Sequence, residues 1–385
     1  MVDYQKHNMA VEKIWKAYRE DKPIRIPVTG GMEIQTFLTM KNYSYKRYYT
    51  DPEFMIKCQL EKQRWCCEHI FADAPAELPE AWGPIRVDFW PIIAEGWLGC
   101  EIIFPEKDTP WVKPLLKGNN KEKLYDMVIP DPLYGNLMQK VSEFHQIFKE
   151  NISSMTYLDR PIKPDIANPA EGTCGPFSDA INLRGATELL QDVYDDPQYV
   201  HRLLSFVTEA IIVRKRAWRK FLGRGEIGSD SHYCVEDHGI GMLSDEMYRE
   251  FVMPYHKKLL ETFVKNRDDC SISLHHCGRG PHLFRTIYEE LGVRSFFNLT
   301  YPNIIDVMSV RRELGEEVYL GVGLHPEIVL NGPESRIYET IKNLMTPEVK
   351  AKGRLYWIQA DFIPPGVPLK HIYAVYKAIK KFGRY

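Results

Sequence analysis

A short segment of the chain places a histidine and a cysteine where both could bind one metal ion. It reads Ser271-Ile-Ser-Leu-His275-His276-Cys277-Gly278, a strand-like run that enters a glycine turn. Side chains alternate faces along a strand, so His275 and Cys277 point the same way and His276 points the other. A catalytic zinc takes three such protein ligands and keeps one position open. The segment predicts two of the three ligands; a buried cysteine beside a hydrogen-bonded histidine is the structural alternative.

Acids, histidines and polar groups also stand where other strand-like runs end. These residues are Glu236, Asp237 and His238, then Asn298 and Tyr301, then His325, and finally Asp361. A chance surface would place such groups on helices and helix-side loops as well. The clustering at strand ends therefore favours a functional site.

The order of elements supplies a scaffold that would bring these ends together. Helical spacing covers 8–20 and 52–70, a strand covers 24–28, and short strands fall within 84–116. From about residue 165, strands at 165–168, 226–235, 270–276, 294–299, 317–322 and 354–360 alternate with helices at 187–221, 245–265, 281–291, 304–313, 334–345 and 368–381. Such alternation is typical of βα units and a parallel sheet.

We predict an α/β protein: a TIM (β/α)8 barrel over residues 23–385, preceded by a helical extension over residues 1–22. The chemistry of such a barrel lies at the carboxyl ends of its strands. An open doubly wound sheet is the alternative, and the lack of a Gly-x-Gly-x-x-Gly run after the first strand weakens it.

The composition excludes several classes of protein. A net charge of -2 on 385 residues indicates neither a nucleic-acid partner nor an anionic membrane partner. No apolar run approaches the roughly 20 residues that cross a bilayer, and the first residues lack the apolar core of a signal peptide. The eight cysteines form no CxxC pair, which favours reduced thiols and a cytoplasmic location.

Several motifs, in the same order, resemble the uroporphyrinogen decarboxylase superfamily. They are Gly175-Pro-Phe177, Leu183-Arg-Gly185, Tyr194-Asp-Asp-Pro197, the run from Leu243 to His256, His275-x-Cys277-Gly278, and Ile363-Pro-Pro-Gly-Val-Pro-Leu369. The resemblance spans about residues 24–380 and implies a single TIM barrel. True decarboxylases carry an arginine-rich run soon after the first strand, which grips the porphyrinogen carboxylates. Here that segment has no arginine after Arg25, and Glu33 has the wrong sign, so we expect a different reaction.

The other branch of the superfamily consists of zinc-dependent, corrinoid-linked methyltransferases. Their motif is His-x-Cys with a distant Cys near the Pro-Pro turn, and this chain has Asp361 at that distant position. A carboxylate in place of a thiolate hardens the ion and makes it a stronger Lewis acid toward an ether oxygen. The resemblance thus implies an aryl methyl ether O-demethylase, acting on methoxylated aromatics such as vanillate.

The aromatic branch is also associated with a spaced pattern that occurs here as Glu246, Glu261 and His282. We do not expect these three to be the ligands, because fifteen residues of helix would separate the glutamates by roughly 22 Å. The expected ligands are His275, Cys277 and an oxygen of Glu236 or Asp361.

In the implied mechanism, the main tasks of the protein are to bind zinc and to bind the substrate. Zinc polarises the ether oxygen, and cob(I)alamin on a separate corrinoid protein, docked at the barrel mouth, takes the methyl group. Asp237 or His238 would bind or protonate the leaving phenolic oxygen. The expected substrate contacts are Trp90, Asn298, Tyr301, His325 and Phe362, with Phe89 and Trp97 as further ring walls. We also expect a homodimer, the common state of such barrels.

Two alternatives stay open at this point. A methylcobalamin:thiol methyltransferase of the same superfamily would use the shared zinc chemistry in the other direction, and methylamine or halomethane members share it too. A non-catalytic barrel that binds a corrinoid or a phenol is the alternative from another class.

Overall fold

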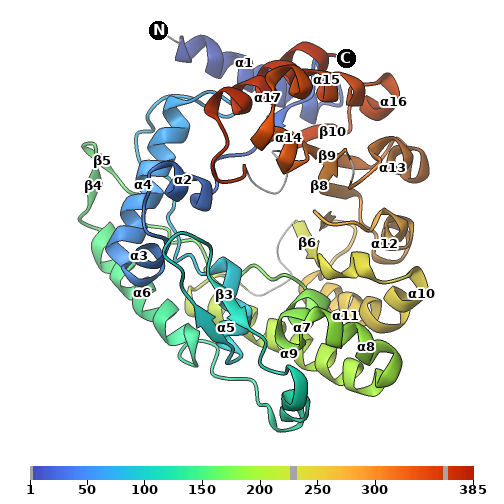
Figure 1. Cartoon of the computed structure of the whole chain (residues 1–385). Helices are drawn as coiled ribbons and strands as arrows, with labels where there is room; N and C mark the ends of the chain where they lie inside the picture. The colour runs from blue at the N-terminus through green and yellow to red at the C-terminus, as the bar shows by residue number, and fades with distance from the viewer. Residues whose placement is uncertain (1–2, 226–231, 303, 359–362) are drawn as a thin grey trace. The chain divides into compact units, whose positions relative to one another are not determined.

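The computed structural model describes residues 3–225, 232–302, 304–358 and 363–385 (Figure 1). By its contacts the chain divides into two compact units. The first unit comprises residues 1–43, 61–79 and 272–385, and the second comprises residues 44–60 and 80–271. Within the described ranges, none of the helices combines the length and the apolar character that a bilayer crossing needs.

The first unit is built around a parallel sheet with the strand order β1-β10-β9-β8-β7. These strands are β1 (Val28–Thr29), β7 (Ser271–His275), β8 (Ser295–Tyr301), β9 (Tyr319–Leu324) and β10 (Leu355–Ile358). A buried row of Leu274, Phe296, Leu320 and Leu355 crosses four of them in register. Because a one-residue slip would turn this row to the other face, the row determines how the strands align.

Helices follow the strands of this unit in alternation, as the βα pattern predicts. They are α12 (Phe284–Leu291), α13 (Val307–Leu314), α14 (Pro326–Asn331), α15 (Glu334–Leu344), α16 (Pro347–Lys350) and α17 (Leu369–Phe382). At the N-terminus, α1 (Tyr4–Arg19) packs on residues 73–76 through its side chains, and α2 (Ile34–Met40) follows β1. The α/β class, the parallel sheet and the helical N-terminus are therefore confirmed.

The second unit is mainly helical in its described part. Its helices are α3 (Tyr45–Thr50), η1 (Trp90–Ile92), α5 (Ile93–Trp97), η2 (Gly118–Asp126), α6 (Leu137–Ile152), α7 (Pro176–Arg184), α8 (Ala186–Asp195), α9 (Pro197–Phe221), η3 (Gly239–Met242), α10 (Asp245–Met247), η4 (Tyr248–Val252) and α11 (Met253–Phe263). Its strands are β6 (His232–Glu236) and two antiparallel pairs, β2 (Glu101–Ile103) with β3 (Trp111–Lys113) and β4 (Thr156–Tyr157) with β5 (Arg160–Pro161). The long helix α4 (Pro52–Glu68) falls where 52–70 was predicted.

Three sequence-based element predictions were wrong in detail. The helix predicted over 187–221 is broken into α8 and α9 at Asp196, because a residue before proline avoids the helical conformation. The helix predicted over 245–265 contains the π-helical turn η4, which ends just before Pro254, a residue that cannot donate a helical hydrogen bond. The strand predicted over 165–168 is reduced to an isolated bridge between Ala167 and Arg86.

Candidate functional site

The end of β7 presents its side chains in the predicted alternation. His276 is fully buried, with its Nε2 3.2 Å from the carbonyl oxygen of Arg279, whereas His275 and Cys277 on the other face are half-buried. The ring of His275 stacks on Phe297 with a centroid distance of 5.1 Å and an interplanar angle of 15°. The pair therefore stands at the end of β7, partly open to solvent.

A β-bulge in β8 aims Asn298 at His275. The pairing register of β8 with β9 shifts between Phe296 and Leu299, and Asn298 has a φ of 62°, which asparagine tolerates better than most residues. Its Nδ2 lies 2.7 Å from Nε2 of His275, and the residue is 5% exposed. Asn298 was predicted to contact substrate; its observed partner is instead the histidine.

The end of β6 is held by the fully buried carboxylate of Asp237. Its Oδ2 accepts the backbone N–H of Phe177 at 2.8 Å, and its Oδ1 accepts the backbone N–H and the hydroxyl of Ser178 at 2.9 and 2.7 Å. A carboxylate on the first N–H groups of a helix satisfies donors that have no partner within the helix and lies at the positive end of the dipole. Asp237 therefore anchors α7. The prediction that it acts on the substrate is corrected to an anchoring role, because its oxygens are already engaged.

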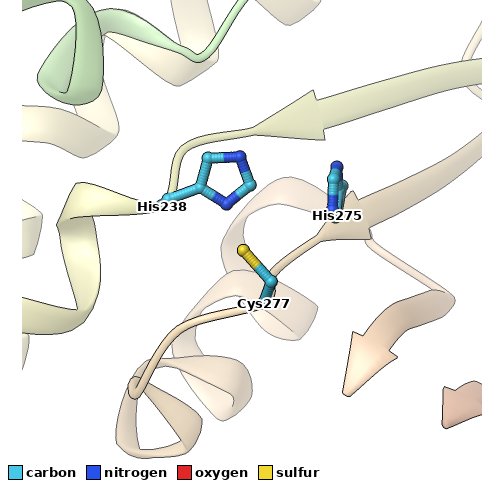
Figure 2. A group of neighbouring side chains, drawn as sticks. All are labelled: His238, His275 and Cys277. Carbon is cyan, nitrogen blue, oxygen red and sulfur yellow. The ribbon is translucent and has the colours of Figure 1, made fainter. Parts of the chain in front are cut away.

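The next residue, His238, turns away from the extended strand. Its φ of -76° and ψ of -30° start the turn that continues into η3. Figure 2 shows its ring with His275 and Cys277, and one ligand atom of each residue lies within 4.8 Å of the others. Imidazole nitrogen and thiolate sulfur are donors that zinc takes in proteins, so the chemistry of this group fits the ion.

The third member of this group differs from the predicted one. Glu236 was predicted as a ligand, yet among the described residues the group contains His238 instead. The physical reason is the turn at His238, which ends the strand alternation on which the choice of Glu236 depended. Asp361, the other predicted ligand, lies outside the described residues, as does Phe362.

Tyr301, His325 and Trp90, the other predicted substrate contacts, each have different neighbours. Tyr301 ends β8, and burial raises its pKa, so the phenol keeps its proton at neutral pH. His325 caps α14 through Nδ1, which accepts the N–H of Glu327 at 3.3 Å. Trp90 in η1 is half-buried and covers Gly172, where an added Cβ would lie 2.7 Å from the indole.

Two predicted ring walls are core residues instead. Phe89 is fully buried and packs edge-on against Phe144, with ring centroids 5.4 Å apart. Trp97 is 1% exposed, and its Nε1 donates to the carbonyl oxygen of Asp131. The prediction that Phe89 and Trp97 line a substrate pocket was wrong, because the spacing of aromatic residues does not separate core from cavity.

The alternative pattern of Glu246, Glu261 and His282 does not belong to the group. All three are exposed, on α10, α11 and η5 (Pro281–Leu283). Bonds to its own backbone N–H and to Ser244 lower the pKa of the Glu246 carboxyl, as expected for an acid in the first turn of a helix.

Sequence reasoning missed a buried pair behind the end of β6. Nε2 of His256 lies 3.3 Å from Asp237, and its Nδ1 lies 3.1 Å from the hydroxyl of Tyr248. Both residues are at most 2% exposed. The only signal in the sequence was a histidine and a tyrosine eight residues apart in a helical segment, which is compatible with any helix.

Comparisons with known proteins agree with this architecture. Residues 92–382 match the family described as Uroporphyrinogen decarboxylase. The uroporphyrinogen decarboxylase of Shewanella piezotolerans is 20% identical over 237 residues, which is 61% of this chain and 61% of that enzyme. The enzyme of Yersinia enterocolitica is 25% identical over 200 residues, 51% of this chain and 52% of that one. The chain thus matches between half and two thirds of the length of these relatives.

A solved structure extends the likeness over the whole chain. The methyltransferase from Methanosarcina mazei matches with a TM-score of 0.62 and 18% identity, covering 97% of this chain and 98% of that one. At this identity the likeness concerns the fold. Together with the family match it confirms the predicted TIM barrel.

Proposed function

The chain belongs to the uroporphyrinogen decarboxylase family, and we propose that it is a zinc-dependent methyltransferase within that family. Its proposed methyl donor is a methoxylated aromatic, and its proposed acceptor is cob(I)alamin on a separate corrinoid protein. The observation that carries this proposal is the group of His238, His275 and Cys277. The fold shared with a Methanosarcina mazei protein described as a methyltransferase supports it.

The donor set suits a catalytic zinc ion. Imidazole nitrogen and thiolate sulfur are common zinc ligands, and three of them leave the fourth position for substrate. Since Asn298 contacts Nε2 of His275, we assign Nδ1 of that ring to the ion. Rotating the amide by half a turn would let its oxygen accept the Nε2 hydrogen, the usual outer contact of a zinc-bound histidine.

The surroundings of Arg25 argue against porphyrinogen decarboxylation. Arg25 is 8% exposed and binds the buried carboxylate of Asp73 through both terminal nitrogens. Asp73 also accepts the backbone N–H of Val28 and the hydroxyl of Tyr376. The arginine is thus part of the interior and is not available to grip the carboxylates of a substrate.

The composition of the donor set favours an ether over a thiol as the reacting partner. Compared with one histidine and two thiolates, two histidines and one thiolate leave a more positive ion, which attracts electrons from an ether oxygen more strongly. A carboxylate ligand would act in the same direction, and Asp361 stays a predicted ligand. A methylcobalamin:thiol methyltransferase remains the second candidate.

The reaction breaks the methyl–oxygen bond and forms a carbon–cobalt bond. Both electrons of the new bond come from cobalt, the oxygen keeps the pair of the broken bond, and the phenolate then takes a proton from water. A zinc ion held by His238, His275 and Cys277 would supply Lewis-acid polarisation of the ether oxygen. Asn298 orients His275, and the protonated Tyr301 at the end of β8 can donate a hydrogen bond to the developing phenolate.

Metal analysis tests the site. The purified full chain should contain about one zinc ion, and His238→Ala, His275→Ala and Cys277→Ala should each lower the zinc content. Glu236→Gln is the matched control, since it changes an acid of the same strand end outside the group, and it should keep its zinc. Full methyl transfer by metal-free protein would refute the proposed site.

A donor screen tests the reaction. Vanillate and the free cobalamin cofactor, reduced to cob(I)alamin, should yield methylcobalamin, visible by its absorption, together with the demethylated catechol. Methylation of a thiol from methylcobalamin, without ether cleavage, would support the second candidate. Binding of vanillate with no turnover in the presence of zinc and cob(I)alamin would favour a non-catalytic barrel.

A further inference from the structure

Ser178 contacts the residues on both sides of His238. Its hydroxyl donates to Oδ1 of Asp237 at 2.7 Å and accepts the backbone N–H of Gly239 at 2.9 Å. Its own backbone N–H donates to the same oxygen of Asp237 at 2.9 Å. The backbone that carries His238 is therefore tied at both ends to the first turn of α7.

The other oxygen of Asp237 leads to a second element. Oδ2 accepts the N–H of Phe177 and lies 3.3 Å from Nε2 of His256, whose Nδ1 is 3.1 Å from the hydroxyl of Tyr248. Burial, then the nearby charge of Asp237, raises the pKa of Tyr248 well above its usual range, so the phenol remains a donor. A consistent direction follows: Tyr248 donates to His256, and His256 donates to Asp237.

The π-helical turn η4 sets the spacing of this pair. Tyr248 begins η4, and His256 lies in the second turn of α11, on the far side of Pro254. A π-helical turn inserts extra backbone into a helix and rotates the residues that precede it relative to those that follow. It thereby decides which side chain of the preceding turn meets His256.

The end of β6 lies close to the start of α7. A Cβ on Gly175 would lie 1.9 Å from the carbonyl oxygen of Glu236, and a Cβ on Gly239 would lie 2.4 Å from Ile181. Gly175 is thus required where the end of β6 meets α7, whereas the contact at Gly239 involves only the Cδ1 end of the Ile181 side chain. No side chain in this network reaches the expected ion itself, so its members act through His238.

We infer that Ser178, Asp237, His256 and Tyr248 form a positioning chain that holds the metal-facing conformation of His238. This inference deepens the proposed function and rests on it. Outer contacts of this kind change metal affinity by about 10–100-fold when they are removed, because the ligand must then be ordered at the expense of binding.

Zinc affinity and the spectrum of the cobalt(II)-substituted protein test the chain. The full-length variants Ser178→Ala and Tyr248→Phe are titrated with zinc against a chromophoric chelator, then loaded with Co²⁺. Ser178→Ala should weaken zinc binding by about 10-fold or more and shift the visible cobalt bands. Tyr248→Phe removes one oxygen at the far end of the chain and should show the same changes to a smaller degree.

Ser309→Ala is the matched control. Ser309 also bonds a helix-capping aspartate, Asp306, through hydroxyl and backbone N–H, at the start of α13. Its loss should leave zinc affinity and the cobalt spectrum unchanged. If Ser178→Ala does not fold, Tyr248→Phe tests the positioning chain by itself.

The proposed function and the positioning chain are contradicted by different results. A wild-type protein that binds neither zinc nor cobalt at the group defeats the proposed function. Wild-type binding with unchanged affinity and spectrum in every folded variant overturns the positioning chain alone.

Discussion

The ends of β6 and β7 deliver histidines in two different ways. At β7, His275 and Cys277 follow strand alternation, and the amide of Asn298 from the neighbouring strand contacts the ring. At β6, the strand is over before His238, and the conformation depends on Ser178 and Asp237. The first arrangement is local and partly exposed, whereas the second is a buried contact with a helix. The difference predicts that the buried anchor at the β6 end contributes more to stability than the half-buried pair at the β7 end.

The largest effect is expected for Gly175→Ala. Gly175 has a φ of 94° and a ψ of 163°, a conformation essentially restricted to glycine, and an added Cβ would overlap the backbone of Glu236. We expect a loss of roughly 3 kcal/mol or more in the free energy of unfolding, measured by urea denaturation. Gly31→Ala, with nothing within 4 Å of its added Cβ, is the control and should change stability by less than about 0.5 kcal/mol. Equal stability of the two variants would contradict the close contact between Gly175 and the backbone of Glu236.

Next in size is the contrast between Asp237→Ala and His275→Ala. Removing Asp237 leaves the buried N–H groups of Phe177 and Ser178 without their acceptor, which should cost about 3–5 kcal/mol in unfolding free energy. Removing the half-buried His275 should cost about 1 kcal/mol or less while abolishing zinc binding. Urea denaturation in the presence of chelator, with metal analysis alongside, measures both. Similar losses of stability would contradict the assignment of separate roles.

A smaller effect is expected for Asn298→Gly. Glycine accepts the φ of 62°, so this change removes the amide that contacts His275 without straining the backbone. Zinc affinity should fall by about tenfold. Asn298→Ala should show the same loss of affinity and a further cost of about 1 kcal/mol in stability from the positive φ. Unchanged zinc affinity in both variants would show that the bulge does not orient the ligand.

The smallest effect concerns Asp179, the residue after Ser178. Burial, then the nearby carboxyl of Glu95, raises the pKa of Asp179 well above its usual range. A raised folded-state pKa gives stability that is present below the unfolded value of about 4 and is lost as the pH rises. The melting temperature of the wild type, relative to that of Asp179→Asn, should therefore fall from pH 4 to pH 8.

Asp306 provides a control of opposite sign. The hydroxyl of Ser309 lowers the pKa of Asp306, so its contribution is present above the unfolded value and lost as the pH falls. The difference between wild type and Asp306→Asn should therefore grow up to about pH 5 and then stay level to about pH 8. If the difference in melting temperature from wild type followed the same course with pH for both variants, the shifted pKa of Asp179 would be contradicted.

Local patterns were sufficient for much of this protein. The alternation of strands and helices predicted the parallel sheet, and alternation within one strand predicted that His275 and Cys277 share a face opposite the buried His276. These are properties of residues a few positions apart, so the amino-acid sequence determines them directly.

Contacts between distant segments decided the rest. The anchoring role of Asp237 depends on Ser178, 59 residues away, and the contact of Asn298 with His275 depends on a bulge between paired strands. No periodicity predicts such contacts, because they arise only when separate elements pack and their unsatisfied polar groups find partners. The sequence by itself therefore determined the α/β architecture and the pair at the end of β7. Tertiary packing alone placed His238 in a turn and turned a predicted catalytic aspartate into a buried anchor.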